Sequence, residues 1–217
     1  MILYRIIKVK WDEVYLISFS HNFGLINPDD DIVTVTADPI RMRYSIPPEN
    51  CYSLNRVVGR RNTEFQDNVH FKYKDIYPNC INSKKMARTK LIIVGHEATF
   101  TKNFTPINFS RLIYFCGAEN ISYITFKCCN IGNSNYLTTL RQLLPEVKLF
   151  SAYKGTIRPY FRKKNGELVV SIRLTESFIE GFLFSNFGKK LPDSFRRQIV
   201  LGKNYKASFF SGTKYIY

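Results

Sequence analysis

Apolar residues form two runs of strand length, at residues 91–94 and 121–126. The first run is followed by Gly95-His96, and the second leads through a lysine into Cys128-Cys129. The residues between the two runs have a helical pattern, so the three segments predict a βαβ unit with parallel strands. Because the carboxyl ends of parallel strands meet at one edge of the sheet, the sequence predicts an imidazole beside a thiol, which is the minimum apparatus of a cysteine nucleophile.

The pattern elsewhere predicts an α/β fold in which helices flank a central, mostly parallel sheet. Further strands are expected at residues 2–9, 13–20, 32–37 and 147–152. Helices are expected at residues 47–58, from Pro106 to Gly117, and from Ser134 to Pro145. Residues 59–88 indicate a loop or a short pair of strands, and Asn165-Gly166 predicts the turn of a β-hairpin. We expect a single domain, residues 1–217, with its core at about 30–175 and a basic extension at 176–217.

The net charge of the chain favours an anionic binding partner. The 217 residues are 45% hydrophobic and carry 32 Lys or Arg against 17 Asp or Glu, which gives a net charge of +15. Such an excess favours binding to nucleic acid, to an acidic membrane surface or to a multiply phosphorylated small molecule. From Lys154 onward there are 13 Lys or Arg and 4 Asp or Glu. Several of these cations fall on the predicted hairpin, where a phosphate-rich ligand can hold them together through charge-assisted hydrogen bonds.

The cysteines indicate reduced thiols. There are five of them, an odd number, and the two at 128 and 129 are adjacent, which does not suggest a disulfide framework. No spacing of Cys and His is that of a zinc site. No apolar run reaches membrane-spanning length, and the first residues lack the layout of a signal peptide.

At its two chemistry-bearing strand ends the chain resembles the cysteine protease domains of RTX toxins and large clostridial glucosylating toxins, which inositol hexakisphosphate activates. It also resembles the related stand-alone bacterial effectors. That family has an apolar strand ending in Gly-His-Gly, a helix, and an apolar strand ending in Gly-Cys, and the matching positions here are Gly95-His96-Glu97 and Cys128-Cys129. A strand opening with Ser-Ala and a basic hairpin follow in the family, as Ser151-Ala152 and Arg162-Lys163-Lys164 follow here. The resemblance covers roughly residues 30–175.

The resemblance implies a caspase-like α/β fold with the hairpin as a basic flap, and the activity of a cysteine endopeptidase. It makes Cys129 the nucleophile and His96 its base, with Asp38, at the end of the strand predicted at 32–37, as the acidic partner of the histidine. It also implies inositol hexakisphosphate as the activator, bound by the hairpin and by basic residues on the sheet. The candidate phosphate ligands are Lys90, Arg56, Arg60, Arg158, Arg162, Lys163, Lys164, Lys189, Lys190, Arg196 and Arg197, of which the last four rest on charge alone.

Proteins of this family act inside host cells. The resemblance therefore implies a secreted effector or toxin fragment that cleaves a host protein in trans, or itself, in the host cytosol. Two departures leave other functions open: Glu97 replaces the glycine beside the expected oxyanion hole, and Cys128 replaces the glycine before the nucleophile. The alternatives are a catalytically degenerate scaffold that binds inositol phosphate or a host protein, and a basic nucleic-acid-binding protein. The chain has no RNA-binding signature or helix-turn-helix pattern to support the latter.

Overall fold

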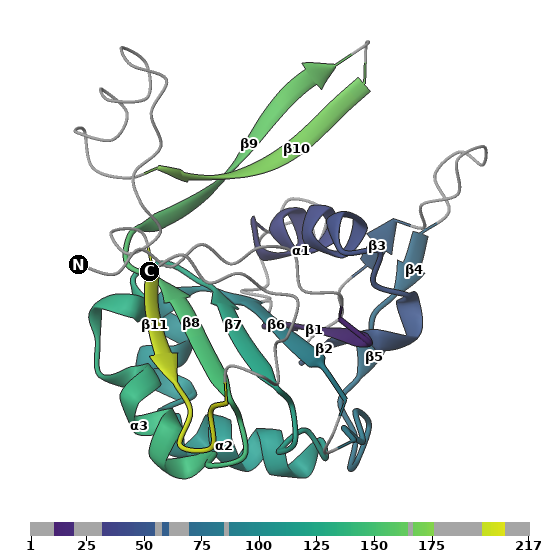
Figure 1. Cartoon of the computed structure of the whole chain (residues 1–217). Coiled ribbons are helices and arrows are strands. Elements are labelled where there is room, and N and C mark those ends of the chain that lie inside the picture. The colour runs from purple at the N-terminus through teal and green to yellow at the C-terminus, as the bar shows by residue number, and fades with distance from the viewer. Residues whose placement is uncertain are drawn as a thin grey trace.

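A central sheet of seven strands organises the computed structural model, which describes residues 11–19, 32–54, 58–60, 70–84, 87–164, 167–175 and 197–206 (Figure 1). In spatial order the strands are β11 (Arg197–Leu201), β8 (Leu149–Tyr153), β7 (Tyr123–Lys127), β6 (Thr89–Gly95), β1 (Glu13–Phe19), β2 (Cys51–Ser53) and β5 (Lys74–Asp75). All neighbouring pairs are parallel except β11 with β8, which is antiparallel. The predicted α/β fold with a mostly parallel sheet is therefore confirmed.

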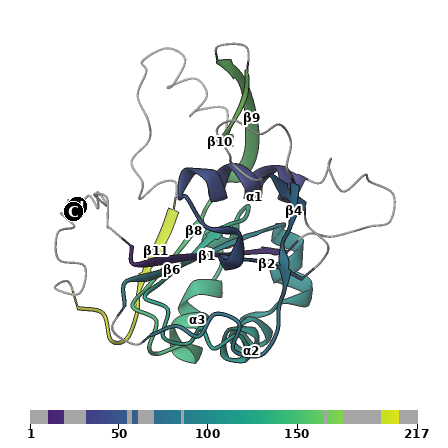
Figure 2. The ribbon, with the colours of Figure 1, turned by 90° about the vertical axis from the view of Figure 1, so that its right-hand side faces the viewer.

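Helices cover both faces of the sheet, which explains why β6, β7 and β8 are buried along their whole length. Figure 2 shows α1 (Ile32–Arg43) on one side of the sheet, and α2 (Pro106–Phe115) and α3 (Tyr136–Leu143) on the other. Because side chains alternate along a strand, β6 contributes to two cores. Ile93 packs in the cluster that contains residues of α2 and α3, whereas Ile92 packs in the cluster that contains residues of α1.

The connection between β6 and β7 is the predicted crossover. It consists of a π-helical turn, η3 (Thr99–Asn103), followed by α2. The side chain of Thr105 caps α2 by accepting a hydrogen bond from the backbone N–H of Asn108, and Pro106 occupies the first turn, where its missing donor is not needed. The parallel pairing of β6 with β7 confirms the βαβ unit.

Two antiparallel strand pairs lie outside the central sheet. The longer is the hairpin of β9 (Thr156–Lys164) and β10 (Glu167–Thr175), which projects on the side of α1 in both views (Figures 1 and 2). Lys164 pairs with Glu167, as the predicted hairpin requires, although the two turn residues at 165–166 lie outside the described residues. The shorter pair is β3 (Val58–Arg60) with β4 (His70–Lys72), so of the two alternatives expected for 59–88, a loop or a short strand pair, the structure has the strand pair, which begins one residue earlier.

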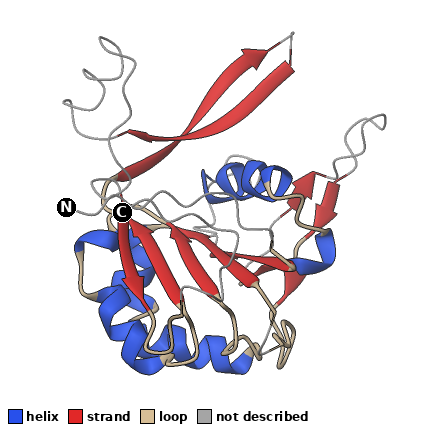
Figure 3. Ribbon diagram, in the orientation of Figure 1, coloured by secondary structure: helices blue, strands red, loops and turns tan. Residues whose placement is uncertain are grey.

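Two predicted elements are wrong. Residues 32–37, expected as a strand because of their β-branched side chains, form the start of α1, which Figure 3 draws as a helix over the sheet. Burial decides the conformation there, because Ala37 and Ile40 are buried against residues of β1, β2 and β6, and tertiary packing of this kind overrides local propensity. The helix expected at 47–58 is a single turn, η2 (Pro48–Asn50), after which the chain enters the sheet as β2. The strand expected at 13–20 is confirmed as β1, whereas residues 2–9 lie outside the described residues.

Candidate functional site

His96 and Cys129 leave the sheet side by side. The register of β6 and β7 pairs Val94 with Lys127. His96 lies two positions after Val94, and Cys129 lies two positions after Lys127. Neighbouring strands run about 4.8 Å apart, and both side chains are half-buried at this edge. The structure therefore brings the predicted imidazole and thiol to adjacent positions of one sheet edge.

The two adjacent cysteines have different surroundings. Cys128 is 1% exposed in the core that contains α2 and α3, where its thiol lies 3.9 Å from the carbonyl oxygen of Ile93. Burial raises the pKa of the Cys128 thiol well above its ordinary value, which disfavours the nucleophilic thiolate. Cys129, one residue further, is half-buried at the edge. Of these two residues Cys129 is thus the partly exposed one, and none of the five cysteines, all of which are described, forms a disulfide.

The residues that follow the histidine and the cysteine are hydrogen-bonded to each other. The side-chain amide of Asn130 donates to the carboxylate of Glu97 over 2.8 Å. The backbone N–H of Asn130 donates to the carbonyl of Gly155, in the connection from β8 to β9, over 3.2 Å. A further bond, from Ile131 N–H to the carbonyl of Cys129 over 2.7 Å, closes a tight turn after the thiol. The Glu97 carboxylate thus has a defined partner.

Close backbone contacts shape this edge. A Cβ atom on Gly95 would lie 2.9 Å from the ring of Phe100, so glycine is what lets the aromatic core reach the end of β6. Gly132, within the turn η4 (Ile131–Asn133), lies against the end of β8, where a Cβ would meet the carbonyl oxygen of Ala152 at 2.8 Å. The side chain of Asn133 donates to the carbonyl of Lys154. The turn after Cys129 is therefore packed and bonded against the end of β8.

Asp38 does not occupy the expected strand end. It lies in α1, where its carboxylate accepts a hydrogen bond from the Nε of Arg41 over 3.1 Å. The prediction that a strand carries Asp38 to the side of His96 is wrong in its structural premise, because the segment is helical.

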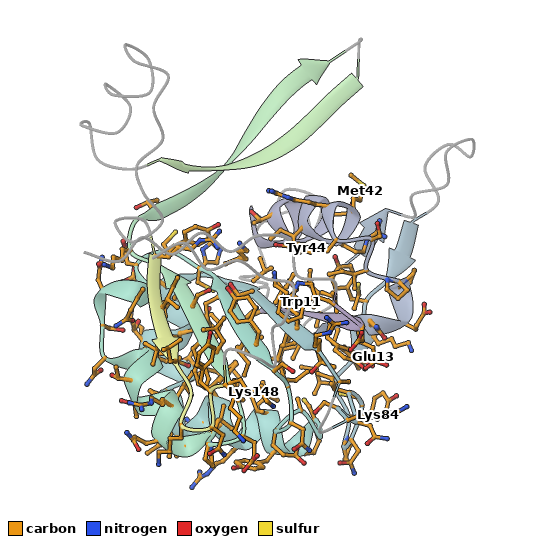
Figure 4. The ribbon with its side chains drawn as sticks, viewed as in Figure 1. Trp11, Glu13, Met42, Tyr44, Lys84 and Lys148 are labelled. Atoms are coloured by element: carbon orange, nitrogen blue, oxygen red, sulfur yellow. The ribbon has the colours of Figure 1, made fainter. Side chains whose placement is uncertain are left out.

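A cluster of buried cations lies on the face of the sheet that α1 covers. Lys90, which is 6% exposed, donates from Nζ to the hydroxyl of Tyr44 over 3.0 Å. The same ammonium lies 4.1 Å from the centre of the Tyr44 ring, 5.5 Å from that of Trp11 and 5.2 Å from that of Tyr123, within the range of cation–π attraction. Figure 4 shows Trp11 and Tyr44 between α1 and the sheet.

Tyr153, the last residue of β8, joins two further cations. Its hydroxyl accepts hydrogen bonds from Lys127 Nζ over 3.0 Å and from Arg197 Nη2 over 2.5 Å. Lys127 is 9% exposed, although it lies only two residues before Cys129. We call Lys90, Lys127, Arg197 and Tyr153 the basic cluster.

The pKa values in the basic cluster reflect burial and crowding of positive charge. Burial lowers the pKa of Lys90 to about 8, and the charges of Lys127 and Arg197 add to this effect. Burial also lowers the pKa of Lys127. For Tyr153 burial alone acts to raise the pKa, but the charges and hydrogen bonds of Lys127 and Arg197 outweigh it and lower the pKa to about 7. Within the described part of the chain neither lysine has a carboxylate partner. Buried charge of this kind is costly unless it is paired, and the Tyr153 oxygen, whose pKa is lowered to about 7, is the partner that the structure gives to Lys127 and Arg197.

The predicted phosphate ligands divide into three groups. Lys90 and Arg197 belong to the basic cluster. Arg60 lies on β3, and the four hairpin residues Arg158, Arg162, Lys163 and Lys164 lie on β9, where the structure describes the backbone. Arg56, Lys189, Lys190 and Arg196 lie outside the described residues.

Sequence reasoning missed Lys127 and Tyr153. The signal for Lys127 was a lysine directly between an apolar run and the buried Cys128, since a charged residue in a strand covered on both faces needs a partner. No local signal marked Tyr153, because its partner Arg197 is brought to it by the antiparallel pairing of β11 with β8.

Neither a metal site nor a membrane-spanning helix is found among the described residues. Among the described residues there is no group of three or more His, Cys, Asp or Glu side chains that could hold a metal ion. In the same ranges, no helix is both long enough and apolar enough to cross a membrane. No protein-family model matches the chain, and no curated protein matches it either.

Proposed function

We propose that the chain is a cysteine endopeptidase activated by inositol hexakisphosphate, similar to the protease domains of RTX and large clostridial glucosylating toxins and to the related bacterial effectors. In this proposal the sheet is caspase-like, the β9–β10 hairpin is a basic flap, and the protein acts on a host protein, or on itself, in the host cytosol. The observation that carries the proposal is the placement of His96 and Cys129 at the same level of two adjacent parallel strands.

The proposed reaction uses the groups at this edge. His96 takes the proton of the Cys129 thiol, the thiolate attacks the peptide carbonyl carbon, and the imidazolium then protonates the leaving amine. Water hydrolyses the resulting thioester, which releases the acid and regenerates the thiol. Backbone N–H groups at residues 96 to 97 and at Cys129 stabilise the oxyanion, a contribution of about 3 kcal/mol per donor; the N–H of Asn130 is not among them, because it donates to the carbonyl of Gly155.

The basic cluster supports a compact polyphosphate as the activator. Each phosphate group carries about −1.5 to −2 charges at neutral pH, and Lys90 and Lys127 are buried cations whose ammonium groups have no carboxylate partner among the described residues. The burial of Lys90 and Lys127 favours a small ligand over nucleic acid, whose backbone is bound by exposed side chains in an extended row. Lys127 and Cys129 lie two residues apart in the chain, so a ligand at the cluster is positioned to affect the thiol.

A binding and labelling experiment tests the proposal. The melting temperature is measured with inositol hexakisphosphate, and with unphosphorylated inositol as a control, and a thiol-reactive peptide probe reports on Cys129. The hexakisphosphate should stabilise the protein by about 2.7 kcal/mol at a hundredfold excess over its dissociation constant, and should accelerate probe labelling. Lys127→Met should remove most of both effects, whereas Lys84→Met, at an exposed lysine labelled in Figure 4, should leave them intact.

The outcomes separate the alternatives. Stabilisation without probe labelling would support the non-catalytic scaffold, which the replacement of glycine by Glu97 and Cys128 favours. Stabilisation by an oligonucleotide but not by the hexakisphosphate would support a nucleic-acid-binding protein. Neither stabilisation nor labelling would refute the proposed activator and the proposed peptidase together.

A further inference from the structure

Asn130 joins the three chain segments that follow β6, β7 and β8 at the sheet edge where His96 and Cys129 lie. It follows Cys129 directly, its side-chain amide bonds to Glu97 after His96, and its backbone N–H bonds to Gly155 after β8. Its own carbonyl accepts a hydrogen bond from Asn133 N–H over 2.9 Å. One residue thus ties the turn after the thiol to both neighbouring connections.

The backbone of Asn130 is specialised for this position. Its φ is +55° and its ψ is −4°, in the left-handed region that asparagine tolerates better than most residues other than glycine. Glycine would accept the same backbone, but it has no amide to offer Glu97. The combination of left-handed backbone and side-chain donor is what asparagine supplies here.

The bond to Glu97 has a chemical consequence. A carboxylate one residue after His96 is able to accept hydrogen bonds from the same backbone donors that an oxyanion needs, and its negative charge disfavours a nearby thiolate. Bonded to the Asn130 amide, the carboxylate is held in one place. A hydrogen bond to a charged group is shorter and stronger than one between neutral groups, so the bond to Asn130 restrains the carboxylate.

We propose that Asn130 is a positioning residue of the candidate catalytic site: it restrains the Glu97 carboxylate and sets the turn that carries Cys129 beside His96. This inference rests on the proposed peptidase function. Under this proposal Glu97 is compatible with catalysis only while Asn130 is present to restrain its carboxylate. In the resembled family a single glycine follows the histidine, and here Glu97, held by Asn130, stands at that position.

The test compares Asn130→Gly with the double variant Asn130→Gly/Glu97→Gln. Glycine keeps the left-handed backbone and removes the amide, and the glutamine removes the charge that the amide restrains. The matched control is Asn82→Gly, the same substitution at an exposed residue with φ +43° in the segment that precedes β6. Two rates are measured for each protein: alkylation of Cys129 by iodoacetamide as a function of pH, and labelling by a peptide probe with inositol hexakisphosphate present.

Asn130→Gly should slow probe labelling about tenfold, the equivalent of about 1.4 kcal/mol, and should move the alkylation profile to higher pH. The double variant should return the alkylation profile to that of the unmutated protein, and Asn82→Gly should match the unmutated protein throughout. A merely structural role for Asn130 would not be reversed by a change at Glu97. The proposal is overturned if Asn130→Gly behaves as the unmutated protein, or if the double variant keeps the shifted profile.

The same measurements distinguish this inference from the proposed function. If the unmutated protein is alkylated at Cys129 but is neither labelled by the peptide probe nor able to cleave peptides, the peptidase is refuted. The alkylation profiles still decide whether Asn130 restrains Glu97.

Discussion

Replacement of Lys90 by methionine should make the free energy of unfolding less dependent on pH between about 8 and 10.5. Burial lowers the pKa of Lys90 from 10.5 to about 8 in the folded protein. In the window between those values the folded protein releases the proton while the unfolded chain keeps it, so stability rises with pH. Each pKa unit corresponds to about 1.4 kcal/mol, and the full rise attributable to Lys90 is about 3 kcal/mol. Methionine fills a similar volume and has no proton to release.

The assay is urea unfolding of the two proteins in steps from pH 7 to pH 10.5. Below pH 8 both states of the unmutated protein carry the charge, so the difference between the two proteins should be constant there. Above pH 8 the free energy of unfolding of the unmutated protein should rise relative to that of the variant, by about 3 kcal/mol over the whole window. Lys84→Met, at an exposed lysine, should give a flat difference over the whole range. A flat difference for Lys90→Met as well would mean that the ammonium is not desolvated, and the account of the basic cluster would fail.

Three further predictions concern the edge and the hairpin. Cys129→Ala should abolish peptide cleavage while Cys128→Ala keeps it, as followed by a fluorogenic peptide assay; an inactive Cys128→Ala that is fully folded, together with an active Cys129→Ala, would place the nucleophile one residue earlier. Charge reversal at Arg162 and Lys163 should slow labelling of Cys129 by a peptide probe in the presence of inositol hexakisphosphate, but not its reaction with iodoacetamide; equal slowing of both would show a general loss of structure. Gly132→Ala should lower the free energy of unfolding by about 1–3 kcal/mol in urea, because its Cβ would meet the Ala152 carbonyl oxygen at 2.8 Å; an unchanged midpoint would mean that the turn shifts freely.

The elements that sequence predicted correctly are those specified by their own residues. The strands β6 and β7 are short apolar runs with clear ends, and the helix between them has its cap and its proline in sequence. Their order along the chain then determines that they are parallel and that their carboxyl ends meet. This is why the neighbourhood of His96 and Cys129 could be derived without tertiary information.

The elements that sequence missed depend on distant partners. Residues 32–37, expected as a strand, form the first half of α1, which packs on the face of the sheet beside β1 and β6. The role expected for Asp38 was lost with that strand. The contact of Tyr153 with Arg197 joins residues 44 positions apart, and it exists because β11 returns antiparallel beside β8. Local patterns carry no information on such a return.

In the proposed enzyme, two short pieces of chain connect the basic cluster with the thiol. Lys127 leads through Cys128 to Cys129, and Tyr153 leads to Gly155, whose carbonyl bonds to the N–H of Asn130. A polyphosphate that binds Lys127 and Arg197 competes with the Tyr153 hydroxyl for their hydrogen bonds, because both offer oxygen acceptors to the same donors. Displacement of Tyr153 would act at the end of β8 and at the start of β9, which begins at Thr156. Because Asn130 is bonded to that connection and to Glu97, a change at the cluster would, in the proposed enzyme, act on both sides of the candidate catalytic pair through hydrogen bonds that are present without the ligand.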